Sequence, residues 1–316
     1  MTNYLRLKQK NEINNVKKYN QTRSMTTEFF DYILEHLEKP WDFKELSMNP
    51  NITYEMVLDH PELDWDWAYL CGNPNITWDM IRSFDVYKTL NYHLVSCNPN
   101  ITWDIVMENP HFPWDYFSLA RNENILFDMF LKNDKHMTYY NSFSYNPNVN
   151  IDIIKNIPGG KWNWVQLTMN ENITWEDIQD TPEFKWDYRW IVFNPNITWD
   201  IVTNNYLPGD NLWETDKLSS NPNITWDIIQ ENKSWVNWDY TYLSANPTIT
   251  WDMVEQDKET HRNHEWDYDI LSINHNISFD IVEAHPEIDW CYTGLSKNHM
   301  KKYIWHNLRT YPYILK

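Results

Sequence analysis

The stretch SSNPNITWDII at residues 219–229 has close copies at 71–81, 96–106 and 192–202. Its first asparagine recurs along the chain at intervals of 24 to 28 residues. The eleven recurring positions are Asn49, Asn73, Asn98, Asn122, Asn146, Asn170, Asn194, Asn221, Asn246, Asn274 and Asn298. A near-constant period of this length over many copies is typical of stacked repeat proteins. The motif therefore predicts one continuous array rather than two unrelated domains.

The spacing within each unit predicts two short helices. WDYTYLSA at 238–245 has apolar residues at positions i, i+4 and i+5, which favours a helix over a strand. The asparagine that follows suits the left-handed position that ends a helix, and proline after it cannot continue the helix. Thr225 is a good N-cap for a second helix, and Asp227 then falls in its first turn, where it favours the positive helix end.

Isolated helices of about two turns are marginally stable in water, so the units must stack. Most units carry a tryptophan eight residues before the first asparagine and an aromatic residue five after it. Each tryptophan can bury about 150–250 Å², which provides a core along the array. We predict an all-α fold: an α-solenoid (superhelix) of about eleven 24-residue two-helix repeats with terminal capping helices.

The chain divides into four expected parts. Residues 1–24 form a basic, flexible tail with a net charge of +5, and 25–39 form an N-terminal capping helix. Residues 40–297 are the tandem-repeat α-solenoid. Residues 298–316 depart from the motif and gain positive charge, which indicates a degenerate last repeat and C-terminal cap.

Three interpretations of the repeated motif were considered. Asn-Ile-Thr is a glycosylation sequon, but the N-terminus has no apolar signal segment, so we expect an intracellular protein that is not secreted. Repeated presentation of a ligand motif remains an alternative. The preferred interpretation is structural: the eleven first asparagines form a ladder whose amides satisfy backbone groups between units.

Charge and composition argue against nucleic-acid binding, a membrane span and a disulfide-linked fold. The net charge is −19, and since 1–24 and 291–316 each carry +5, the body between them carries −29. Such a surface repels phosphate backbones, so no nucleic acid is expected as a partner. No apolar run reaches the roughly 20 residues of a membrane span, and three scattered cysteines do not indicate a disulfide framework.

No motif predicts catalysis, and we expect no cofactor, no metal site and no enzyme. HRNHE at 261–265 lacks cysteine partners and helical zinc-site spacing, so it is interpreted as a polar loop. IPGGK at 157–161 lacks the spacing of a phosphate-binding loop and is interpreted as a widened turn. Cys71 and Cys97 are expected to be buried structural thiols, and the aspartates that follow tryptophan are expected to cap helices.

Longer segments between consecutive units indicate where a protein partner could bind, since insertions in repeat proteins gather on one edge. They are 203–212, 231–237 and 255–265. We predict that they cluster in space and form a protein-binding surface, with neutral variation in exposed loops as the alternative. The residues expected to contribute to this surface are Tyr206, Leu207, Trp235 and His261.

Over about residues 40–305 the NPNITWDIV array resembles the tandem-repeat proteins of giant, amoeba-infecting DNA viruses of the mimivirus type. The resemblance implies a viral origin and carries no catalytic residues. We expect a non-enzymatic scaffold for protein–protein interaction, acting in the host cell or in the virion. The alternatives are a self-assembling structural or virion component, an RNA-binding repeat array and an enzyme with an unrecognised site; helical repeats can recognise single bases, but the acidic body argues against RNA.

Overall fold

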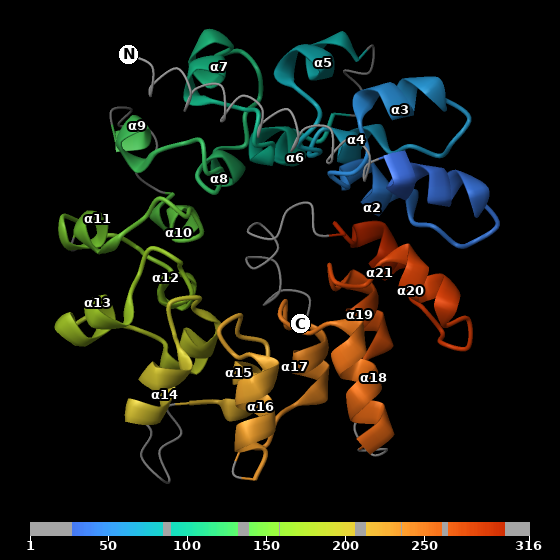
Figure 1. The fold of residues 1–316 in the computed structure, drawn as a ribbon. Helices are drawn as coiled ribbons and strands as arrows, with labels where there is room; N and C mark the ends of the chain where they lie inside the picture. Colours follow the sequence, from blue (N-terminus) through green and yellow to red (C-terminus); the bar gives the residue numbers. More distant parts are fainter. Residues whose placement is uncertain are drawn as a thin grey trace, which may run out of the picture.

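The computed structural model describes residues 27–84, 90–131, 139–157, 159–205, 213–234, 236–260 and 265–300. Within these segments every regular element is a helix, and no strand occurs. The predicted all-helical class is therefore confirmed. Inner and outer helices alternate along the chain around a ring (Figure 1).

The inner helices are short and follow one another around the inside of the ring. They are α2 (Phe43–Met48), α4 (Trp67–Leu70), α6 (Tyr92–Cys97), α8 (Tyr116–Leu119), α10 (Tyr140–Phe143), α12 (Trp164–Thr168), the 3-10 helix η2 (Tyr188–Phe193), α15 (Thr215–Leu218), α17 (Tyr240–Ser244), α19 (Tyr268–Ile273) and α21 (Tyr292–Lys297).

The outer helices each follow an inner helix after a turn that contains the repeated asparagine. They are α3 (Tyr54–Asp59), α5 (Trp78–Ser83), α7 (Trp103–Glu108), α9 (Phe127–Leu131), α11 (Ile151–Lys155), α13 (Trp175–Asp180), α14 (Trp199–Asn205), α16 (Trp226–Asn232), α18 (Trp251–Thr260) and α20 (Phe279–Ala284).

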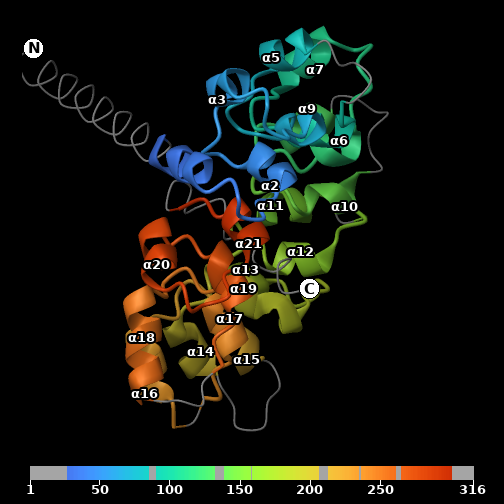
Figure 2. The same cartoon turned by 90° about the vertical axis from the view of Figure 1, so that its right-hand side faces the viewer.

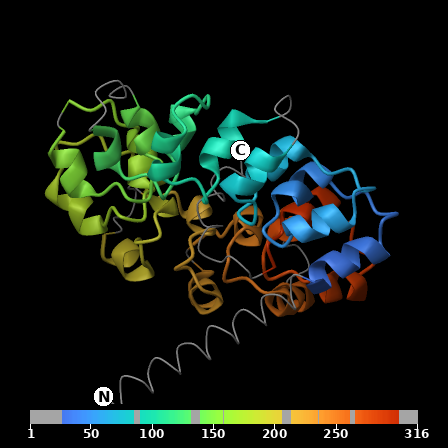
Figure 3. The same ribbon diagram turned by 90° about the horizontal axis from the view of Figure 1, so that it is seen from above.

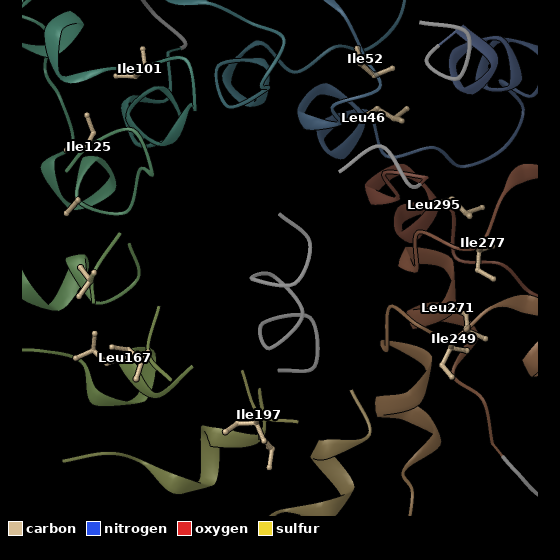
Figure 4. Packing of buried hydrophobic residues seen from close by; sticks show 14 of the residues in the cluster. Leu46, Ile52, Ile101, Ile125, Leu167, Ile197, Ile249, Leu271, Ile277 and Leu295 are labelled. Carbon is tan, nitrogen blue, oxygen red and sulfur yellow. The ribbon is translucent and has the colours of Figure 1, made fainter. Parts of the chain in front are cut away.

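The core runs around the ring between the two layers of helices. The leucine three residues before the repeated asparagine and the isoleucine three after it are almost fully buried, as at Leu46 and Ile52. Figure 4 shows these side chains recurring around the ring, with Leu295 of the last unit close to Leu46 of the first. The array therefore has one continuous core rather than one core per unit.

Both helices of a unit begin at a polar cap. Thr53 caps α3 by accepting the N–H of Met56, and the corresponding threonines cap five further outer helices. The inner helix α2 begins at Asp42, whose carboxylate accepts two backbone N–H groups. These side chains satisfy donors that the first turn of a helix leaves free, which explains why threonine and aspartate recur at these positions.

The left-handed conformation expected for the first asparagine of the motif was wrong. Asn49 has φ −65° and ψ 128°, and Asn98 has φ −61° and ψ 128°. A following proline favours an extended backbone, but Asn274 and Asn298, which are followed by histidine, have nearly the same angles, so the turn between the two helices and its ladder bonds hold this conformation. Among the described non-glycine residues only Met300 has a positive φ, of 44°.

The two ends of the array contact each other. Figure 2 shows α21 beside α2, and Figure 3 shows the first and last units on the same side of the molecule. Asp42 donates its N–H to Ser296 Oγ at 3.1 Å, just as Asp66 donates to Ser47 Oγ at 2.9 Å inside the array. A superhelix with two sealed ends was expected, whereas the observed helices form a closed ring because the last inner helix docks on the first.

A helix at 27–35 completes the junction. Phe29 stacks on Phe279 of α20, with ring centroids 5.3 Å apart, and Phe30 packs against Trp65 at 6.0 Å. This helix was expected to cap the first unit only; it also contacts the last outer helix, so it lies where an outer helix after α21 would lie. The expected basic tail at 1–24 and the C-terminal cap beyond Met300 lie outside the described residues.

Candidate functional site

The repeated asparagines form a ladder of hydrogen bonds around the ring. Each of the eleven donates its Nδ2 to the backbone carbonyl of the corresponding asparagine in the preceding unit, at 2.9 to 3.1 Å. The ladder has no end, because Asn49 of the first unit donates to the carbonyl of Asn298 of the last at 3.0 Å.

Most ladder amides bond further backbone groups, as Asn98 illustrates. Asn98 also donates to the carbonyls of Cys71 at 2.8 Å and Ile76 at 3.0 Å, and its Oδ1 accepts the N–H of Asn100 at 2.8 Å. The Nδ2 of Asn100, the second asparagine of the motif, donates in turn to the carbonyl of Pro74 at 2.8 Å. The motif that dominates the sequence therefore bonds backbone groups of neighbouring units and holds the ring together.

A second set of bonds between units was missed by the sequence analysis. The hydroxyl two residues before the ladder asparagine accepts the N–H of the inner-helix N-cap in the next unit, as Ser96 does from Asp115 at 3.0 Å. The repetition of serine or threonine at this position was the available signal. The residues that accept this bond are Ser47, Ser96, Ser144, Thr168, Ser219, Ser244, Ser272 and Ser296.

The buried tryptophan before each inner helix normally donates its indole N–H to a carbonyl of its own chain. Trp65 Nε1 donates to the carbonyl of His60, five residues earlier, at 2.9 Å. His60 follows α3 with φ −126° and ψ 62°, a conformation that turns its carbonyl toward the indole. The same bond joins Trp41 to His36, Trp114 to Asn109, Trp186 to Thr181 and Trp290 to His285, at 2.9 to 3.1 Å.

Trp238 breaks this pattern. The residue five before it, Lys233, has helical angles of φ −61° and ψ −14°, so its carbonyl is not turned toward the indole as that of His60 is. Trp238 is 8% exposed, and its Nε1 has no hydrogen-bond partner in the part of the chain that the structure describes. A buried donor without a partner costs about 1–3 kcal/mol, so this indole calls for an explanation.

The same tryptophan lines a cavity of about 260 Å³. The cavity lies where α16, α17 and α18 meet, next to parts of two of the lengthened segments, 231–237 and 255–265. Its walls are apolar at Ile229 and Val236, aromatic at Trp238 and Tyr240, and polar at the remaining positions. The complete lining is Ile229, Gln230, Lys233, Val236, Asn237, Trp238, Tyr240 and Asp257.

Asp257 is the buried charge of this site, at 1% exposure. Its carboxylate accepts the indole N–H of Trp266 at 3.2 Å and the phenol of Tyr240 at 3.4 Å. Burial, followed by the Asp257 charge, raises the pKa of Tyr240 well above its usual range, so the phenol remains protonated at neutral pH. Tyr240 is thus a hydrogen-bond donor to Asp257.

Trp162 offers a comparison within the same chain. Its Nε1 also has no hydrogen-bond partner among the described residues, and it follows the turn at 157–161. That turn is closed by the Gly160 N–H, which donates to the carbonyl of Ile157 at 3.0 Å. A Cβ on Gly160 would lie 2.4 Å from Trp162 Nε1, so the glycine backbone covers this indole. Of these two unpartnered indoles, only that of Trp238 belongs to a residue lining the cavity.

A second polar cluster lies at α8. His93 Nδ1 is 3.0 Å from Asp115 Oδ2, and Ser118 Oγ donates to the same carboxylate oxygen at 2.7 Å while also approaching His93 Nδ1. A catalytic relay needs serine and aspartate on opposite ring nitrogens, whereas here both face Nδ1, and Ser118 is fully buried. Burial opposes ionisation of Asp115, but hydrogen bonds from Ser118 and His93 outweigh it and keep the pKa of that carboxyl below its usual range.

A shallower hollow of about 550 Å³ lies at the ring junction, between Trp41, Trp65 and Thr293. Its carboxylates at Asp42 and Asp66 already accept the backbone N–H groups at the start of α2 and α4. These two carboxylates therefore stabilise the helices of the ring, as the ladder asparagines stabilise its turns.

All four residues predicted to bind a partner, Tyr206, Leu207, Trp235 and His261, lie outside the described residues. Cys71, Cys97 and Cys291 are free, and burial raises the pKa of the Cys71 thiol to about 11. In the described segments no group of three or more histidine, cysteine or acidic residues could hold a metal ion. None of the described helices combines the length and apolar character needed to cross a membrane.

No protein-family model, curated protein or solved structure matches the chain. The candidate site is therefore defined by its own geometry: a cavity beside the two lengthened segments, with a buried carboxylate and an indole donor without a partner.

Proposed function

We propose that the protein is a non-enzymatic scaffold, a closed α-solenoid of about eleven two-helix units that binds a protein partner. One observation carries this proposal. The repeated polar side chains are used by the frame, while the departure from the repeat at Trp238 leaves a buried donor beside a cavity. A closed ring with a local departure from its repeat is well suited to present a binding surface.

The sequence resemblance to giant-virus repeat proteins supports a viral origin, with action in the host cell or in the virion. The acidic body would steer a partner with a basic surface toward the ring, because long-range charge accelerates encounter.

The other functions have less support. End-to-end self-assembly needs free faces at the two ends of the array, but α2 and α21 cover each other's faces. Recognition of RNA needs a basic surface, and the body carries a large negative charge. Catalysis needs a positioned acid, base or nucleophile, and the Ser118, His93 and Asp115 cluster lacks relay geometry.

The test is affinity capture of the tagged protein from amoebal lysate, followed by calorimetry with the purified candidate partner. It compares the wild type with a variant whose segments 203–212 and 255–265 are shortened to the basic period. Met107→Ala on the outer helix α7, where Met107 is 54% exposed, is the matched surface control. We expect a partner that the wild type and the control bind and the shortened variant loses. No direct partner for any of the three proteins would overturn the proposal.

A further inference from the structure

We propose that the surface formed by Tyr92, His93, Phe117 and Arg121 binds a carboxylate side chain of the protein partner, with the Arg121 guanidinium as the hydrogen-bond donor. These residues lie on the neighbouring inner helices α6 and α8, or two residues after α8, and are called the α6–α8 surface (Figure 1). The inference rests on the scaffold function and names a chemical group that the partner presents.

Two aromatic rings hold the guanidinium of Arg121. Its Cζ lies 4.3 Å from the ring centroid of Phe117 in the same unit and 3.9 Å from that of Tyr145 in the next unit. A guanidinium over a ring face is attracted to it and keeps its planar set of N–H donors at its edge. The rings therefore restrict this side chain before a ligand arrives, which lowers the entropic cost of binding.

Arg121 differs from the other two arginines that the structure describes. Arg82 also lies over an aromatic ring, that of Trp78, but it pairs with the carboxylate of Asp79. Arg189 pairs with Asp187 at 2.7 Å. Arg121 forms no ion pair with any residue of the described segments, so its charge is available to a group from outside the chain.

The Nη atoms of Arg121 are the donors that a ligand can reach. Its Nε is buried and has no hydrogen-bond partner in the described part of the chain. The residue as a whole is only partly buried, and Nε is its one nitrogen that is both buried and without a partner. A planar carboxylate can accept from both Nη groups at once, which is the geometry that guanidinium and carboxylate share.

The carboxylate on the same inner helix is already used. Asp115 accepts the N–H of Phe117 at 3.1 Å and the hydroxyl of Ser118 at 2.7 Å, and it lies 3.0 Å from His93 Nδ1. These bonds fix Asp115 as the N-cap of α8 and account for its charge within the helix. Arg121 is therefore left as a cation that its own unit does not neutralise.

Exposed aromatic side chains surround this cation. Tyr92 and Phe117 are each 38% exposed, and the side chain of His93 is 49% exposed. Aromatic residues and arginine are enriched at the centres of protein–protein interfaces, where they supply most of the binding energy. The α6–α8 surface therefore fits a segment with an aspartate or glutamate next to apolar residues.

The charge of the rest of the chain favours a single carboxylate over a polyanion. The strongly acidic body repels a chain of phosphates, and one arginine does not offset that repulsion. A partner with a basic surface is attracted to the body, and one acidic side chain on it can still pair with Arg121. The guanidinium then fixes where on the ring such a partner binds, since paired charges set orientation.

The test follows the arginine Nε–H signals of the full-length protein by two-dimensional NMR. The Arg121 signal suits this method because its Nε is shielded from water, and Arg121→Gln assigns it by its loss. The wild type is titrated with N-acetylglutamate N-methylamide, with its neutral analogue N-acetylglutamine N-methylamide, and with inorganic phosphate, all at one ionic strength. Arg82 and Arg189, which already have carboxylates, are the internal controls.

We expect the glutamate probe to shift the Arg121 signal in a saturable way and to leave the Arg82 and Arg189 signals unchanged. The glutamine probe should bind at least about tenfold more weakly, because the charge-assisted bonds are lost. Phosphate should also bind more weakly than the glutamate probe. An unshifted Arg121 signal, equal shifts of all three arginines, equal binding of the glutamine probe, or tighter binding of phosphate would overturn the inference.

Partner affinity provides a second measurement. Arg121→Gln should weaken the partner found by affinity capture at least about tenfold, whereas Arg82→Gln should leave its affinity within about twofold. If Arg121→Gln does not fold, Arg121→Lys takes its place, since lysine keeps the charge but loses the planar pair of donors, and it should bind the partner at least about threefold more weakly. Urea unfolding confirms that each variant is folded.

The two proposals fail in different ways. If a direct partner is found and the Arg121 variant keeps its affinity within about twofold, the scaffold function stands and the carboxylate contact is wrong. If the protein has no direct partner, the scaffold proposal is overturned, and with it the assignment of the carboxylate to a partner, even where the glutamate probe shifts the Arg121 signal.

Discussion

In two regions of the ring the same repeat forms different hydrogen bonds at its tryptophan. Around α2 to α7 the outer helices have 6 residues each, and Trp65 finds its acceptor in the carbonyl of His60. Around α16 to α18 the outer helices are longer, with 7 residues in α16 and 10 in α18, and Trp238 lacks that acceptor, while Trp266 uses the carboxylate of Asp257. The asparagine ladder nevertheless continues through the longest interval, where Asn274 donates to the carbonyl of Asn246 at 3.1 Å.

The difference shows which bonds depend on the end of the outer helix. Ladder bonds join turns that are packed against each other inside the ring, so an outer helix can lengthen without displacing them. The indole bond of Trp65 joins the tryptophan to the residue that ends the outer helix, so a change of conformation at that residue, as at Lys233, can remove the acceptor. The ladder therefore tolerates a longer outer helix, and the indole bond depends on how that helix ends.

The largest effect is expected where the two ends of the array meet. Phe29 is 2% exposed and stacks on Phe279, so Phe29→Ala should lower the free energy of unfolding by about 3–5 kcal/mol. Urea unfolding measures the loss, and hydrogen exchange should show faster exchange in α20 than in α13. Met107→Ala is the control and should change stability by less than about 0.5 kcal/mol. A loss below about 1 kcal/mol for Phe29→Ala would mean that the helix at 27–35 does not hold the junction.

Replacing a ladder asparagine should lower the free energy of unfolding nearly as much. The loss should be similar in both regions. Asn98→Leu removes three bonds to carbonyls and leaves the carbonyl of Cys71 and the N–H of Asn100 without this partner in a buried place, so we expect a loss of about 3 kcal/mol. Asn274→Leu, between the lengthened units, should fall within about 1 kcal/mol of that value. Chemical denaturation checks both. A much smaller loss at Asn274 would show that insertion does weaken the frame.

The indoles should distinguish the two regions. Trp65→Phe removes a donor and leaves the carbonyl of His60 without it, so we expect a loss about 1 kcal/mol greater than that of Trp238→Phe. Both changes remove a similar aromatic volume, so packing losses largely cancel. Thermal and urea unfolding of the two variants measure the difference. Equal losses would contradict the assignment of Trp238 as a donor without a partner.

The smallest effect on stability is expected for the carboxyl group of Asp115, the N-cap of α8. Because the pKa of Asp115 is lower in the folded protein, its ionised form contributes stability above the unfolded pKa of about 3.9, and this is lost as pH falls through the folded pKa. Asn is an equally good N-cap, so Asp115→Asn should lose only the charge-dependent part, a few tenths of a kcal/mol. The stability gap between wild type and variant should narrow from about pH 6 to pH 3; a constant gap would contradict this assignment.

The sequence predicted the local structure well, for physical reasons that lie within one unit. Thr53 and its equivalents signal helix starts, and the apolar spacing around Leu46 and Ile52 signals the buried faces. Closure was not predicted, because the curvature of an array depends on small rotations at every contact between units. One signal was available: Phe30, Ile33 and Trp41 precede Tyr54, Val57 and Trp65 by one 24-residue period.

The candidate site was predicted only at the level of segments. Lengthening at 231–237 and 255–265 indicated the right part of the chain, but not Trp238, Asp257 or Tyr240. The sequence shows that a segment is longer, and it does not show that Lys233 takes helical angles and turns its carbonyl from the indole. The Trp238 indole lacks a partner because of the backbone conformation of Lys233, and composition and spacing do not show that conformation.

Closure of the ladder from Asn298 to Asn49 also constrains how such a gene can change. An open array can gain or lose a copy at an end, because each remaining unit keeps its neighbours. In this ring each unit provides about one eleventh of a full turn, so a duplicated or deleted copy would leave a gap or an overlap at the junction. Selection then acts to keep the number of units constant. Sequence changes accumulate more readily in the segments that connect the units than in the number of units.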